Sequence, residues 1–157
     1  MSFRSGYAAL IGRPNVGKST LLNQILGEKL AIVTHKAQTT RHRITGIHTD
    51  DISQIIFLDT PGYHESSKPL NQAMIEVVDN VIGDADVICL LVDPRISDLE
   101  LEQKLFERIG KNRCIVVINK ADTVKSERFK ELADLLHARW GVEEVMAVSA
   151  LEGIGVK

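Results

Sequence analysis

The sequence predicts an α/β domain in which helices cover both faces of a mostly parallel, doubly wound sheet. Short apolar runs alternate with longer segments of helical periodicity, which is the order that builds such a sheet. Two runs, "DVICLLVD" (86–93) and "RCIVVIN" (113–119), are continuously apolar, as strands buried on both faces are. The length of 157 residues fits a single domain.

The first part of the chain predicts a strand, a helix and a hairpin. "YAALI" (7–11) is a short buried strand, and a glycine-rich turn leads from it into a helix over residues 18–27, which stops at Gly27. A polar loop without periodicity follows over 28–42. "RITGIHT" (43–49) and "SQIIFLD" (53–59) flank an acidic turn and predict an antiparallel hairpin.

The second part adds three helices and completes the sheet. The predicted elements are helices over 69–83, 99–110 and 126–141 and a last strand over 143–149. Ser126 is expected to cap the third of these helices. We therefore expect a six-stranded sheet with one antiparallel edge strand. Because "SALEGIGVK" (149–157) stops where the alternation requires another helix, we expect the last helix to be missing and the domain, 1–157, to be truncated at its C-terminal end.

Composition narrows the class of protein. A net charge of −2 and a pI near 6.2 argue against a domain that binds polyanions over its whole surface. Cys89 and Cys114 lie in apolar runs, so we expect buried free thiols and a reducing compartment. The chain has no signal-peptide pattern and no apolar run of about 18 residues. We therefore expect a cytoplasmic protein.

The segment "GRPNVGKS" (12–19) matches the pattern G-x-x-x-x-G-K-[ST] between a predicted strand and a predicted helix. Its backbone N–H groups would wrap phosphates. Lys18 would reach the β- and γ-phosphates, and the Ser19 hydroxyl would bind Mg²⁺. A chance match in a glycine-rich turn is the weaker interpretation in this context. The predicted binding residues are Gly12, Arg13, Pro14, Asn15, Val16, Gly17, Lys18, Ser19 and Thr20. The pattern indicates a P-loop NTPase.

The segment "FLDTPG" (57–62) supplies a second phosphate-side motif at the end of the neighbouring strand. Asp59 has the position of the carboxylate that holds Mg²⁺, and the Gly62 N–H could bond a γ-phosphate. A bare D-x-x-G string is a common turn, so its weight comes from its place after a phosphate loop. The residues added to the site are Asp59, Thr60, Pro61, Gly62 and Tyr63.

The segment "NKAD" (119–122) predicts the base. Guanine presents two parallel donors, N1–H and the amino group at C2, which the Asp122 carboxylate can accept together, whereas adenine offers no such pair. Asn119 would hold the loop, and the Lys120 stem would cover the ring. The "SAL" segment after the last strand adds Ser149, Ala150 and Leu151 to the site. The predicted ligands are GTP or GDP with Mg²⁺.

These segments resemble the G1, G3, G4 and G5 elements of a translation-factor-type GTPase, in the expected order, and the predicted sheet is small G-protein-like. The chain resembles the Era family of bacterial ribosome-assembly GTPases over essentially its whole length. "GRPNVGKSTLLNQILGEKLAIVTHKAQTTRHRITGIHT" (12–49) and "DTPGYH" (59–64) carry the resemblance. It implies that Thr39 and Thr40 belong to switch I and that Thr40 joins Ser19 and Asp59 as a metal ligand.

The resemblance also implies partners. A C-terminal KH domain of the family binds the 3′ end of small-subunit ribosomal RNA in the 30S ribosome. Because we expect that domain to be absent from these 157 residues, we do not carry RNA binding over to this chain. Peripheral membrane association is a further candidate, and we expect this domain to be a monomer.

One expected catalytic residue is missing. Ras-type enzymes orient the attacking water with a glutamine after the switch glycine, whereas this chain has Tyr63 there. The catalytic candidates are therefore Lys18, Thr40, Gly62 and Asn15. In related GTPases, an asparagine at the Asn15 position can ligate K⁺ and offset developing charge, although Asn15 could also only stabilise its loop.

Two other functions stay open. A P-loop kinase is disfavoured because "NKAD" specifies guanine. A binding module gated by GTP and GDP, with negligible hydrolysis until a partner or RNA binds, is harder to exclude, because intrinsic rates of such switches are slow.

Overall fold

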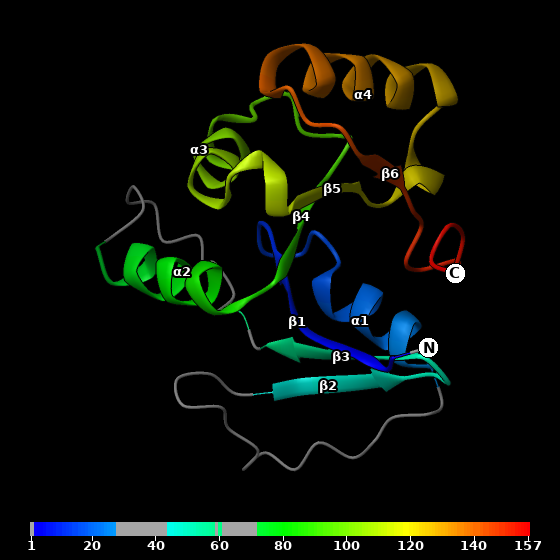
Figure 1. The fold of residues 1–157 in the computed structure, drawn as a ribbon. Helices are drawn as coiled ribbons and strands as arrows, with labels where there is room; N and C mark the ends of the chain where they lie inside the picture. The colour runs from blue at the N-terminus through cyan, green and yellow to red at the C-terminus, as the bar shows by residue number, and fades with distance from the viewer. Residues whose placement is uncertain (1, 28–43, 59, 61–71) are drawn as a thin grey trace.

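Six strands form one sheet, in the order β2-β3-β1-β4-β5-β6 (Figure 1). The computed structural model describes residues 2–27, 44–58, 60 and 72–157. The strands are β1 (Arg4–Ile11), β2 (Ile44–Thr49), β3 (Ser53–Leu58), β4 (Val87–Val92), β5 (Cys114–Ile118) and β6 (Val145–Ala147). The predicted fold class is confirmed, because β2 pairs antiparallel with β3 at one edge and the other four strand pairs are parallel.

Within the described residues, four α-helices pack on the two faces of this sheet. They are α1 (Lys18–Leu26), α2 (Gln72–Asp84), α3 (Glu100–Ile109) and α4 (Ser126–Trp140). Neighbouring strand residues alternate between two cores: Ile11 lies with α2, α3 and α4, whereas Leu10 lies with Leu21 of α1. In the larger core the rings of Phe106 and Trp140 stack 5.1 Å apart. Helices therefore cover both faces, as predicted.

The ends of the elements follow local chemistry. Asp50 closes the predicted hairpin, since its carboxylate accepts hydrogen bonds from the N–H groups of Ile52 (2.8 Å) and Ser53 (2.6 Å). These bonds lower the pKa of Asp50. The prediction that Ser126 caps α4 is wrong by one residue. Lys125 occupies the N-cap position without a side-chain bond, and Ser126 is already helical.

The sheet face beside α1 carries an apolar groove of about 680 Å³. Tyr7, Cys89 and Met146 line it, together with Val156 and Lys157 near the end of the chain. The expectation of a further helix on this domain stays a prediction. No helix in the described part of the chain is long and apolar enough to cross a membrane.

Both cysteines are free thiols, as predicted. Cys114 is buried, and Cys89 is only partly buried beside the groove. Burial raises the pKa of the Cys89 thiol to about 11 and that of the Cys114 thiol to about 12. Both thiols are therefore protonated and unreactive near neutral pH.

The strand order fixes where a ligand can bind. After β1 the chain fills β2 and β3 on one side and then crosses to β4, β5 and β6 on the other. A crevice forms outside the carboxyl ends of parallel strands where the order reverses in this way. The glycine-rich loop that follows β1 lies at this point of reversal.

Candidate nucleotide-binding site

The loop between β1 and α1 is packed so tightly that two of its glycines are required. A Cβ on Gly12 would lie 2.9 Å from the carbonyl oxygen of Leu91 in β4. Gly17, the N-cap of α1, has a φ of 103°, and a Cβ there would collide with the side-chain amide of Asn119. The backbone can therefore curl closely over the start of α1, as a phosphate-binding loop requires.

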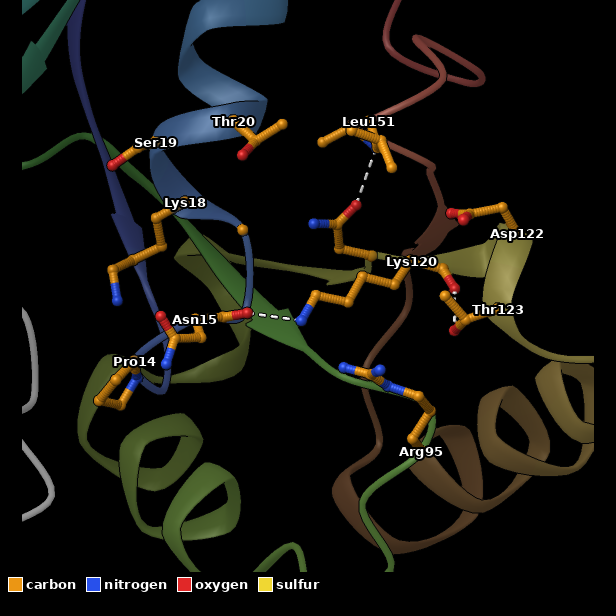
Figure 2. Close-up of a pocket in the computed structure, with 13 residues that line it drawn as sticks. Pro14, Asn15, Lys18, Ser19, Thr20, Arg95, Lys120, Asp122, Thr123 and Leu151 are labelled. Carbon is orange, nitrogen blue, oxygen red and sulfur yellow. Dashed lines mark hydrogen bonds between the residues drawn. The ribbon is translucent and has the colours of Figure 1, made fainter.

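Lys18 lies inside this curl. Its ammonium donates to the carbonyl oxygens of Gly12 (2.8 Å) and Arg13 (3.2 Å), and burial lowers its pKa. Ser19 and Thr20 are exposed in the first turn of α1, where the helix dipole favours an anion (Figure 2). An incoming phosphate would meet a cation already in place and a helix N-terminus.

Asn119 ties three loops together from the end of β5. Its buried side chain donates to the carbonyl oxygen of Val16 (2.9 Å) and accepts from the Ala150 N–H (2.9 Å). The phosphate loop, the "NKAD" segment and the "SAL" segment therefore form one connected body. The side chain of Val16 itself is buried in the core below.

Lys120 runs across the site toward the phosphate loop. It has a left-handed backbone, with φ of 57°. Its ammonium donates to the carbonyl oxygen of Asn15 (2.5 Å) and pairs with the Asp93 carboxylate (3.3 Å), as Figure 2 shows for the first contact. This extended stem is the surface on which a base ring can lie.

Asp122 is held at the far end of the site from Lys18. Its Oδ1 accepts a hydrogen bond from the Ser149 hydroxyl at 2.6 Å, while the residue itself stays exposed. The Ser149 side chain also accepts from the N–H of Glu152 at 3.3 Å. The buried Ser149 hydroxyl therefore fixes the orientation of the carboxylate that was predicted to read the base.

One pocket of about 550 Å³ extends from Lys18 in the phosphate loop to Asp122. Its lining consists of Pro14, Asn15, Gly17, Lys18, Ser19, Thr20, Arg95, Asn119, Lys120, Asp122, Thr123, Ala150 and Leu151. All but two of these were predicted from the motifs. The exceptions are Arg95, which follows β4, and Thr123 (Figure 2).

A smaller cavity of about 90 Å³ adjoins Lys18 and Ser19 and extends to Thr60. The Thr60 hydroxyl donates to the carbonyl oxygen of Leu10 at 2.7 Å, which ties the chain after β3 to β1. Ser19 lines both cavities, so it lies between the phosphate loop and the end of β3.

The remaining predicted site residues lie outside the described residues. They are Thr40, Asp59, Pro61, Gly62 and Tyr63, and the same holds for the switch I residue Thr39. Within the described part of the chain, no three His, Cys, Asp or Glu side chains gather as a metal site. The predicted Mg²⁺ set of two hydroxyls and a carboxylate is nevertheless made only of oxygen ligands, which Mg²⁺ prefers.

Asp93, which follows β4, was not among the predicted site residues, and the structure gives it a part in holding the site. Its buried carboxylate accepts from the Arg95 guanidinium (3.0 and 2.7 Å) and pairs with Lys120. These bonds, led by those of Arg95, hold the pKa of Asp93 well below its usual range. The sequence did hold a signal for this contact. Asp93 and Arg95 are opposite charges that directly follow a buried strand, at the same sheet edge as the phosphate loop and the "NKAD" segment.

Comparison with known proteins fits this geometry. A model of the protein family described as "50S ribosome-binding GTPase" matches residues 7–120, which contain the phosphate loop, Asn119 and Lys120. The chain belongs to this GTPase family.

The resemblance to the Era family is also confirmed. GTPase Era of Syntrophus aciditrophicus (strain SB) is 43% identical over 156 residues, which are 98% of this chain and 51% of that protein. GTPase Era of Geotalea uraniireducens (strain Rf4) is 43% identical over 99% of this chain and 53% of its own length. The chain thus spans about half the length of the curated relatives it matches.

Solved structures of Era are similar too. An Era complex with MgGDPNP and nucleotides 1506–1542 of 16S ribosomal RNA gives a TM-score of 0.72 at 40% identity, over 96% of this chain and 53% of that one. An Aquifex aeolicus Era variant bound to GDP and AlF4⁻ gives a TM-score of 0.70 at 40% identity, over 95% and 52%.

Proposed function

We propose that this chain is a GTP-binding switch domain that hydrolyses GTP to GDP and phosphate with Mg²⁺. The observation that carries the proposal is the single pocket that has Lys18 at one end and the fixed Asp122 carboxylate at the other. A cation and backbone N–H groups suit phosphates, whereas an oriented carboxylate suits the paired donors of guanine. A related protein has been solved with MgGDPNP, which supports both ligands.

The protein groups would supply position and charge rather than covalent catalysis. Lys18 would exchange its contacts with Gly12 and Arg13 for β- and γ-phosphate oxygens. Ser19, with Asp59 and Thr40, would hold Mg²⁺. When bound, the ion would neutralise charge on the phosphate oxygens.

We further propose a role in assembly of the small ribosomal subunit, in the cytoplasm. The support is the similarity to Era, one structure of which holds nucleotides of 16S ribosomal RNA. The net charge of −2 suggests that RNA is bound outside this domain, which then acts as the nucleotide-dependent switch. We further propose that this domain is a monomer, with peripheral membrane association as a further candidate.

We also propose that Asn15 helps to bind K⁺ during hydrolysis, in place of the absent glutamine. Asn15 is exposed at the pocket, and its backbone has a φ of 60°. An alanine there would combine loss of the amide with left-handed strain, whereas glycine removes the amide and keeps the backbone. Asn15→Gly is therefore the clean substitution.

The experiment measures phosphate release from GTP with Mg²⁺ in matched KCl and NaCl buffers. We expect hydrolysis by the parent chain to be faster in KCl and the difference to vanish in Asn15→Gly, because the cation would lose its ligand. A K⁺ effect that survives in the variant would refute the role of Asn15. Negligible release in both salts, with intact GDP binding, would favour the gated binding module.

A further inference from the structure

The side chain of Arg13 leaves the phosphate loop and pairs with Glu102 of α3, 89 residues away. The Arg13 Nε donates to Oε1 at 2.5 Å, and a terminal guanidinium nitrogen donates to Oε2 at 3.0 Å. The same nitrogen donates to the carbonyl oxygen of Asp98 at 2.9 Å. The Arg13 guanidinium therefore binds both carboxylate oxygens of Glu102 and the backbone of Asp98, which precedes α3.

The Glu102 end of this pair is rigid. Its side chain is 1% exposed, and its neighbours Leu105, Phe106 and Ile109 anchor α3 in the larger core. A buried carboxylate is retained only with a partner that satisfies it. The position of Glu102 is thus set by packing, and the Arg13 side chain must come to it.

The Arg13 end of the pair lies where the phosphate loop turns. The Arg13 carbonyl oxygen accepts from the Val16 N–H at 3.3 Å and from the Lys18 ammonium at 3.2 Å. Fixing the Arg13 side chain therefore fixes the peptide that closes the loop and holds the cation. On the opposite side, the loop rests against β4 through Gly12.

We propose that Arg13 and Glu102 form a positioning pair, through which α3 holds the phosphate loop in its binding shape before the nucleotide arrives. The inference rests on the proposed function, because it requires phosphates in this loop. Preorganisation of this kind raises affinity by removing the cost of ordering the loop on binding. Arg13 then acts through the loop backbone rather than as a phosphate ligand.

The same helix supplies a matched control. Arg108 of α3 pairs with Asp79 of α2 at 2.6 and 2.8 Å, but both side chains are exposed and neither lines the nucleotide pocket. Removing one charge of this second pair perturbs α3 without touching the loop. Asp79→Asn and Glu102→Gln therefore make the same chemical change on two pairs of one helix.

The test compares the 157-residue parent with Glu102→Gln, Arg13→Lys and Asp79→Asn. Arg13→Lys keeps the positive charge but lacks the guanidinium that binds Glu102 through two nitrogens. Its GDP affinity therefore tests the pair even if Glu102→Gln does not fold. The measurements are GDP affinity, the melting temperature without nucleotide, and the ³¹P resonance of the β-phosphate of bound GDP. The position of this resonance depends on the loop around the phosphate. A variant that is only less stable would leave the resonance where it is in the parent chain.

We expect Glu102→Gln and Arg13→Lys each to weaken GDP binding by about tenfold, roughly 1.4 kcal/mol, and to shift the β-phosphate resonance. Asp79→Asn should leave both unchanged. Affinity within about twofold of the parent in the folded variants, or a fall in affinity with an unmoved resonance, would overturn the inference. A parent chain that does not bind GDP would instead refute the proposed function.

Discussion

Replacing Asp122 by asparagine is expected to lower the affinity for GDP by about a thousandfold, because sites built to hydrogen-bond a ligand reject mismatched donors and acceptors strongly. The carboxylate would accept both guanine donors, whereas an amide offers one acceptor and one donor. Xanthine keeps N1–H and carries a carbonyl at C2, which matches the amide. Binding of xanthosine diphosphate should therefore improve while binding of GDP is lost.

Titrations of GDP and xanthosine diphosphate into the Asp122→Asn variant measure this exchange. Asp134→Asn is the control, because Asp134 is exposed on α4 and removal of its charge leaves the pocket unaltered. Unchanged GDP affinity in Asp122→Asn would mean that this carboxylate does not read the base.

Replacing Lys18 by methionine should weaken GDP binding at least about a hundredfold. Hydrogen bonds to charged groups contribute roughly 1.5–3 kcal/mol each, and Lys18 lines the pocket in which phosphates would bind. Without nucleotide the chain should remain folded, because burial already lowers the pKa of Lys18 and disfavours its charge.

Nucleotide titration and thermal melting of the Lys18→Met variant separate these two effects. We expect the melting temperature without nucleotide to move by no more than a few degrees, since about 2–4 °C corresponds to 1 kcal/mol at this size. Wild-type affinity in a folded variant would contradict the assignment of the phosphate loop.

The hairpin shows why most of the fold could be predicted. Apolar alternation and an acidic turn are local signals, and the Asp50 carboxylate does close that turn. The boundaries were less secure. β1 begins at Arg4 rather than Tyr7, because its exposed first residues pair with β3 through backbone bonds that need no apolar pattern. β6 is likewise shorter than expected.

The site residues also fall into two groups: those predicted from local motifs and those that only the folded chain brings together. Lys18, Asn119 and Asp122 were found because their roles are encoded in short contiguous motifs. The Arg13–Glu102 pair was not, since it joins positions 89 residues apart whose meeting depends on how α3 packs. The contact of Asp93 with Lys120 was missed for the same reason.

The central claim is that this chain has a guanine-specific nucleotide site, and competition tests it most directly. GDP and ADP would be titrated, with Mg²⁺ present, against a fluorescent GDP analogue bound to the parent chain. The account predicts that GDP displaces the analogue and that ADP needs at least about a thousandfold higher concentration. Equal displacement by ADP, or no binding of the analogue at all, would contradict it.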